Sequence, residues 1–179
     1  MNLSITNIFI FILVTVLIAV FSWNYSIRDK RLHGIPRFFS FESIILLLIL
    51  NLKEWFSEPF SFIHILSWIF LIFSAVFGLA GWILLKRKGK SEGAFENTTV
   101  LVQTGLYQYI RHPLYSSLLL LGTGIMLKDP GLPQIILSII NFISLFITAK
   151  VEEKEMLSRF GDEYKKYKKT TRMFIPYIF

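Results

Sequence analysis

The sequence predicts an all-α membrane protein with about five membrane-spanning helices in a single domain, residues 1–179. Of its 179 residues, 54% are hydrophobic and 17% are charged, and the mean hydropathy is +0.57. This is more apolar side chain than a water-soluble domain of this length needs to fill its core. The apolar residues gather in five runs separated by short polar or charged stretches, so we expect a multi-pass integral membrane protein in contact with membrane lipids.

The first two runs are residues 3–23 and 38–52. The first has 21 residues without a charge, enough to cross about 30 Å of hydrocarbon at about 1.5 Å per residue. The second is shorter and contains Glu42, so we expect it to be tilted or to begin at the interface. The loop between them, 24–37, has four basic residues against one acid, which favours the cytosolic side.

The third run, 60–85, ends on a Lys-Arg-Lys-Gly-Lys cluster, which again favours the cytosol. An irregular polar loop is expected at 89–98. The last two runs, 114–127 and 131–149, flank the sequence KDPGLP. Because its prolines and glycine break a helix, we predict a helical hairpin that enters and leaves the membrane on one side.

The charged tail after this hairpin is predicted to be cytosolic and to form an amphipathic helix. Five spans that start outside bring the chain back to the cytosol, where the tail is rich in Lys. Apolar, aromatic and carboxylate residues recur there at three- and four-residue spacing: Glu153, Leu157, Phe160, Tyr164 and Tyr167. Gly161 is predicted to interrupt the helix.

Composition also argues against several functions. The net charge is +7, but the basic residues flank the apolar runs, so we do not expect nucleic-acid binding. Cysteine is absent, which removes disulfides and thiolate metal sites. His64 has no second metal-type residue one turn away, so we expect a hydrogen-bonded histidine between helices and no metal.

Polar and aromatic residues gather in TGLYQYIRHPLYSS, residues 104–117. This segment is predicted to lie at the cytosolic mouth of the hairpin, and Glu152 and Glu153 lie at the exit of the same hairpin, so the two sets should meet. A carboxylate pair beside the bilayer is costly unless cations or donors match it, and Arg111 and His112 could do so. The cluster is either an interfacial ion-pair network or a pocket for a polar, partly cationic small molecule.

At these residues the sequence resembles the isoprenylcysteine carboxyl methyltransferases and the related phospholipid methyltransferases of membranes. The likeness runs from about Thr98 to the C-terminus and includes LVQTGLYQYIRHPLY, KDP, EE, and FGDEYKKYKK followed by FIP. Their combined spacing makes the resemblance specific. It divides the domain into N-terminal spans, 1–88, and a cofactor-binding half, 98–179.

The resemblance implies methyl transfer from S-adenosylmethionine at the cytosolic face. In this chain the implied cofactor-binding residues are Thr99, Val100, Leu101, Val102, Gly105, Tyr107, His112, Pro113, Leu114, Tyr115, Glu152 and Glu153. Glu152 is the candidate for the cofactor ammonium and His112 for its carboxylate or a ribose hydroxyl. Methyl transfer relies on positioning, so we expect His112, Tyr115 and Glu152 to position the reactants and no residue to act as a covalent nucleophile.

The resemblance is weaker for the methyl acceptor. In the eukaryotic prenylcysteine enzymes that the sequence resembles, an Arg that engages the acceptor carboxylate stands where this chain has Thr148. Lys150 is a possible substitute that lacks the bidentate fork of Arg. An isoprenylcysteine-type carboxylate, held near Thr148 and Lys150, is the favoured lipid or prenylated acceptor. The alternatives are the amine of phosphatidylethanolamine, a lipid double-bond reductase that uses NADPH, and a non-catalytic scaffold that binds anionic lipid through its basic tail.

Overall fold

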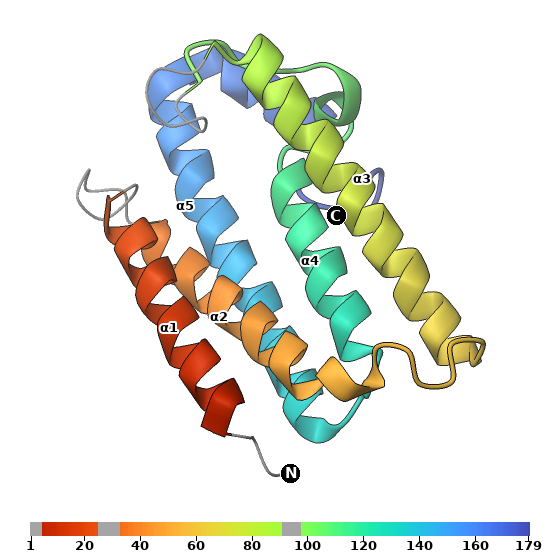
Figure 1. Ribbon diagram of the computed structural model, residues 1–179. Helices are drawn as coiled ribbons and strands as arrows, with labels where there is room; N and C mark the ends of the chain where they lie inside the picture. The colour runs from red at the N-terminus through yellow and green to blue at the C-terminus, as the bar shows by residue number, and fades with distance from the viewer. Residues whose placement is uncertain (1–4, 25–32, 91–97) are drawn as a thin grey trace. The chain divides into compact units, whose positions relative to one another are not determined.

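The computed structural model describes residues 5–24, 33–90 and 98–179, and within these ranges the chain is helical, with no strand (Figure 1). The five α-helices described are α1 (Ile5–Ser22), α2 (Gly34–Leu50), α3 (Phe62–Lys88), α4 (Pro113–Met126) and α5 (Leu132–Thr170). Two 3₁₀ helices, η2 (Leu52–Glu54) and η3 (Gly105–Gln108), lie in the connections. The all-α prediction is confirmed.

Each predicted apolar run is a helix, but the start of the second was placed too late. α2 begins at Gly34 rather than at residue 38, because Pro36 lies in the first turn, where a missing backbone N–H costs nothing. α3 and α5 are long and apolar enough to cross a membrane, and α1 and α4 are shorter apolar helices. The predicted loops at 24–37 and 89–98 include residues 25–32 and 91–97, which lie outside the described residues.

The chain forms two compact units. The first contains residues 1–71 and 119–148, and the second contains residues 72–118 and 149–179. Three helices, α3, α4 and α5, therefore contribute residues to both units.

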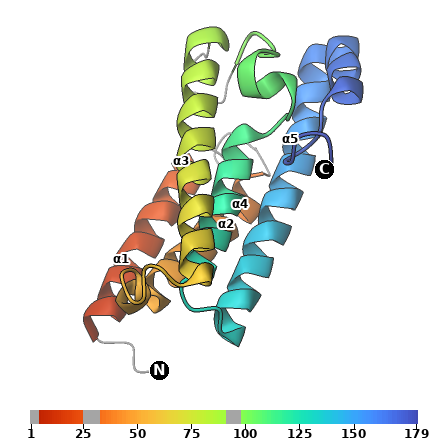
Figure 2. The same ribbon diagram turned by 90° about the vertical axis from the view of Figure 1, so that its right-hand side faces the viewer.

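In the first unit, α1 and α2 lie side by side (Figures 1 and 2). The Thr15 hydroxyl donates a hydrogen bond of 2.9 Å to Oε2 of Glu42, so the carboxylate inside the second apolar run has a partner. Ser40 donates to Oδ1 of Asn141 at 2.6 Å, which ties α2 to α5. Such bonds stabilise contacts between helices where no water is available.

The turn between α4 and α5 is held by side chains of the same unit. Nε2 of His64 lies 2.9 Å from the Lys128 carbonyl oxygen, and Nδ2 of Asn51 donates to the Ile125 carbonyl at 2.6 Å. His64 is thus the hydrogen-bonded histidine that was predicted. The Lys128 ammonium lies 4.0 Å from the centre of the Trp68 ring, a cation–π contact.

In the second unit, α3 packs closely on the first turns of α4. The Ser74 hydroxyl donates to the Ser117 carbonyl at 2.8 Å, and a Cβ at Gly81 would lie 3.1 Å from Cβ of Pro113. Later in this unit Gly161 has φ 52° and ψ −124° and interrupts α5, as predicted. Figure 1 shows α5 changing direction toward its C-terminal end.

Candidate functional site

Gly105 directs the start of the 104–117 segment. Its φ is +63°, and a Cβ there would lie 2.6 Å from Cδ1 of Leu84, so only glycine fits without displacement. The η3 turn that follows turns Tyr107 inward, where its side chain is buried. The backbone geometry of one glycine therefore sets the position of the first aromatic residue of the site.

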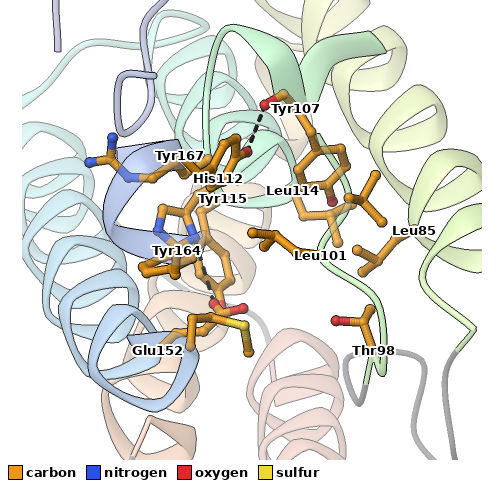
Figure 3. Close-up of a pocket in the computed structure, with 13 residues that line it drawn as sticks. Leu85, Thr98, Leu101, Tyr107, His112, Leu114, Tyr115, Glu152, Tyr164 and Tyr167 are labelled. Atoms are coloured by element: carbon orange, nitrogen blue, oxygen red, sulfur yellow. Dashed lines mark hydrogen bonds and ion pairs between the residues drawn. The ribbon is translucent and has the colours of Figure 1, made fainter. Parts of the chain in front are cut away.

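The C-terminal segment fixes the other end. Residues 110 and 172 form a parallel bridge, in which Arg111 N donates to the Arg172 carbonyl at 2.8 Å. The next amide, that of His112, donates to the Met173 carbonyl at 3.2 Å. The Tyr167 hydroxyl donates to the Tyr107 carbonyl at 2.6 Å (Figure 3). Residues far apart in the sequence therefore hold the Arg-His-Pro backbone in place.

Glu153 is the buried anion of this network. Its side chain is 3% exposed, and Oε1 accepts a 2.7 Å charged hydrogen bond from Nε of Arg111. Nζ of Lys168 lies 2.6 Å from Oε2. Glu153 lies beyond the apolar run of α5. Burial acts to raise the pKa of its carboxyl, but the neighbouring His112, Lys168 and Arg111 outweigh burial and hold the pKa well below its usual range. Glu153 therefore stays ionised and holds three elements together.

His112 lies between the two carboxylates. Nδ1 is 3.6 Å from Oε2 of Glu152, and Nε2 is 3.7 Å from Oε1 of Glu153. Its ring stacks on that of Tyr115 with centroids 5.4 Å apart and an interplanar angle of 18°. The imidazole thus lies between two carboxylates and against an aromatic face.

Several of these groups line an open pocket in the second unit (Figure 3). It is lined by Leu85, Thr98, Leu101, Val102, Tyr107, Arg111, His112, Leu114, Tyr115, Glu152, Met156, Tyr164 and Tyr167. The Glu152 side chain is 25% exposed, and unlike Glu153 it is available to a ligand. Burial, and then the charge of Glu152, raises the pKa of Tyr107 well above its usual value, so this phenol stays protonated.

The structure brings together most of the residues predicted for the cofactor. Seven line the pocket: Leu101, Val102, Tyr107, His112, Leu114, Tyr115 and Glu152. Five do not: Thr99, Val100, Gly105, Pro113 and Glu153. Their contacts are structural: the amides of Thr99 and Val100 both donate to the Gly89 carbonyl, and Glu153 holds Arg111.

The two residues predicted for the acceptor do not line the pocket either. Thr148 has no exposed surface, and its hydroxyl donates to the Ser144 carbonyl at 2.7 Å. Lys150 is exposed.

Six lining residues were not predicted as ligand contacts: Leu85, Thr98, Arg111, Met156, Tyr164 and Tyr167. Helical spacing in the sequence could have indicated some of them. Met156 lies one helical turn after Glu152, and Tyr164 and Tyr167 share the predicted amphipathic face with Glu153. Leu85 belongs to an apolar helix whose residues give no indication of which face meets the site.

The polar cluster divides into two parts. Arg111 and Glu153 form a structural ion pair, whereas Glu152 and His112 face a pocket. In residues 5–24, 33–90 and 98–179, no group of acidic and histidine side chains could hold a metal ion.

The profile of the phospholipid methyltransferase family matches residues 62–163, more than half of the chain. A protein-S-isoprenylcysteine O-methyltransferase of Saccharomyces cerevisiae is 37% identical over 86 residues, which cover 46% of this chain and 35% of that protein. A methanethiol S-methyltransferase of Bradyrhizobium diazoefficiens is 29% identical over 72 residues, covering 40% and 25% respectively. The chain thus spans about a quarter to a third of the length of these relatives.

Proposed function

The chain belongs to the phospholipid methyltransferase family, and we propose that it is an integral membrane methyltransferase that transfers a methyl group from S-adenosylmethionine to a lipophilic acceptor. The observation that carries this proposal is the pocket itself. It combines one accessible carboxylate, Glu152, with a fixed histidine, several tyrosines and an apolar wall.

These residues fit the cofactor. S-adenosylmethionine has an α-ammonium, an α-carboxylate, an adenine and a sulfonium, and when bound it supplies an electrophilic methyl group. Glu152 would hold the ammonium, and His112 would donate to the carboxylate or to a ribose hydroxyl. Tyr107 and Tyr115 offer aromatic faces to cationic groups, and Leu101 and Leu114 offer apolar surface.

Most of the remaining residues proposed for the site act by holding these groups. Gly105 sets the turn that places Tyr107, and Glu153 fixes Arg111 and flanks His112. Pro113 begins α4 directly after His112. The amides of Thr99 and Val100 fix the backbone that leads to Leu101. The protein contributes positioning, the main requirement of an in-line transfer between two bound molecules.

For the acceptor we propose an isoprenylcysteine-type carboxylate, supported by the name of the yeast relative and by the apolar residues of the pocket. A second candidate is a neutral thiol. It is favoured by one observation: the guanidinium of Arg111, the one guanidinium among the described lining residues, is bound by Glu153. A carboxylate acceptor therefore has to find its cation elsewhere, for which Lys150 is the candidate. Thr148, the other position that we propose for the acceptor, carries no charge. The amine of phosphatidylethanolamine is a third.

We further propose one domain over residues 1–179 with five spans, the pocket and the basic tail facing the cytosol. Its N-terminal spans are 1–88, and its cofactor-binding half is 98–179. The basic residues at the end of α3, Lys86, Arg87 and Lys88, support this orientation. Cysteines introduced at Ser57 and Ser158 test it: an impermeant thiol reagent applied outside should label the first and spare the second.

The proposed activity is tested by transfer of labelled methyl from S-adenosylmethionine by the protein in mixed micelles. The acceptors are N-acetyl-farnesylcysteine, the methyl ester of the same compound with its thioether intact, a farnesyl thiol and phosphatidylethanolamine. Transfer to the free acid but not to its ester supports the carboxylate, and transfer to the thiol or the amine supports one of the alternatives. Binding of NADPH without binding of S-adenosylhomocysteine would refute the methyltransferase proposal in favour of a reductase.

A further inference from the structure

The C-terminal segment, residues 164–179, has two chemically different sides. One side is buried against the candidate site, where the ring of Phe174 lies 6.1 Å from that of His112. The other side is exposed and basic. It carries Lys165, Lys166, Lys169 and Arg172, of which Lys165 pairs with the exposed Asp162, and the segment itself contains no Asp or Glu.

The segment ends in a folded apolar tip, residues 174–179. The amide of Phe174 donates to the Phe179 carbonyl at 2.8 Å, and the amide of Phe179 donates to the Ile175 carbonyl at 3.1 Å, so the tip is an ordered turn. Tyr177 and Ile178 are each 78% exposed on it. Large apolar side chains that gather at an ordered, exposed turn mark a contact surface, because their burial is strongly favourable.

The tip is attached to the first turn of α4. The Ser116 hydroxyl donates to the Phe174 carbonyl at 2.8 Å, and the His112 amide donates to the Met173 carbonyl. Ser116 lies at the start of the apolar run of α4. In the topology proposed above, that position is the level of the bilayer interface, where aromatic residues and lysines are enriched.

From these observations we propose that residues 165–179 form a docking surface for anionic lipid. Lys166, Lys169 and Arg172 contact the headgroups, and Tyr177 and Ile178 insert at the boundary with the acyl chains. A basic surface beside an apolar tip matches a negatively charged bilayer in both charge and polarity. Because Met173 and Phe174 also hold His112, the lipid contact is joined directly to the candidate site. The inference rests on the proposed topology and not on methyl transfer.

Single cysteines can test this docking surface, because the native chain has no Cys. Spin labels at Ile178→Cys, Val76→Cys and Ser158→Cys are compared in nanodiscs of phosphatidylcholine with and without phosphatidylserine. The readout is collision with oxygen, which concentrates in lipid, against collision with a water-soluble nickel chelate. Val76 is an exposed residue of apolar α3 and serves as the lipid reference, and Ser158 is an exposed residue of the charged half of α5 and serves as the water reference.

We expect the label at position 178 to favour oxygen several-fold over the label at 158, and phosphatidylserine to increase this preference. Lys166→Gln with Lys169→Gln should remove the effect of phosphatidylserine without changing the label at 76. A water-like label at 178 in both lipids, with the label at 76 in lipid, would overturn the docking surface. So would a label at 178 that is immobilised only by an added acidic peptide, which would indicate a protein partner. A water-like label at 76 would instead overturn the topology.

Discussion

Arg111→Gln is expected to destabilise the fold through the buried carboxylate of Glu153. The substitution removes the 2.7 Å charged hydrogen bond to Glu153 and the bond from Nη1 of Arg111 to the Thr171 carbonyl. Glutamine is polar like arginine, but it is smaller and has no positive charge. The change therefore acts on the junction between the Arg-His-Pro segment, α5 and the C-terminal segment.

The expected cost follows from the burial of Glu153. Removing one partner of a buried ion pair costs about 3–5 kcal/mol when the other charge is left uncompensated. Here Nζ of Lys168 remains 2.6 Å from the second oxygen, so we expect the lower cost of a charged hydrogen bond, about 2–3 kcal/mol. For a chain of this size that corresponds to a fall in melting temperature of roughly 5–10 °C.

The pH dependence has a definite sign. The pKa of Glu153 is lower in the folded protein than its ordinary value. The ionised carboxylate thus stabilises the fold fully above the unfolded pKa of about 4.3, and this stability is lost as the pH falls through the folded pKa. The gap between wild type and Arg111→Gln should be widest at neutral pH and should narrow below about pH 4.

The assay is thermal unfolding in detergent, followed by intrinsic fluorescence from pH 7 down to pH 3. Lys165→Gln is the matched control, because it removes an exposed ion pair with Asp162 and should leave the melting temperature unchanged. A melting temperature for Arg111→Gln equal to that of wild type at pH 7, or a gap that widens in acid, would refute the reasoning.

Three further predictions concern the same unit and the acceptor. Gly105→Ala should cost at least about 1–2 kcal/mol in thermal unfolding, because φ is +63° and the new Cβ would meet Leu84. Tyr167→Phe should cost about 0.5–1.5 kcal/mol and weaken binding of S-adenosylhomocysteine, because it removes the donor to the Tyr107 carbonyl. Thr148→Arg should lower the melting temperature, because this side chain has no exposed surface; a folded variant with faster prenylcysteine methylation would place Thr148 at the acceptor instead.

Much of the fold was predictable, because each helix contains a run of apolar residues and because glycine and proline interrupt or separate the helices. Gly161 interrupts α5 where the sequence predicted, and the Lys128–Pro130 turn separates α4 from α5. The start of α2 was not predictable from hydropathy. Arg37 and Glu42 are buried in α2. Hydropathy alone assigns charged residues to the membrane interface, because it takes no account of tertiary contacts that bury them.

The site was predictable to the extent that its residues are neighbours in sequence. The Arg-His-Pro segment and the Glu152–Glu153 pair could be placed together through the hairpin. The different roles of Glu152 and Glu153 could not be predicted. Adjacent residues on a helix point about 100° apart, and the tertiary contacts decide which of the two faces the pocket. Glu153 is taken by Arg111 and Lys168, and these contacts leave Glu152 accessible.

The central claim, that Glu152 and its neighbours form a pocket for S-adenosylmethionine, is tested most directly by calorimetric titration of the solubilised protein with S-adenosylhomocysteine. The wild-type protein should bind S-adenosylhomocysteine. Glu152→Gln should bind about ten- to a hundredfold more weakly, the equivalent of a charged hydrogen bond of about 1.5–3 kcal/mol. Asp162→Asn, an exposed acid outside the pocket, should bind as wild type does. Unchanged affinity in a folded Glu152→Gln variant, or no binding by the wild type, would contradict the account.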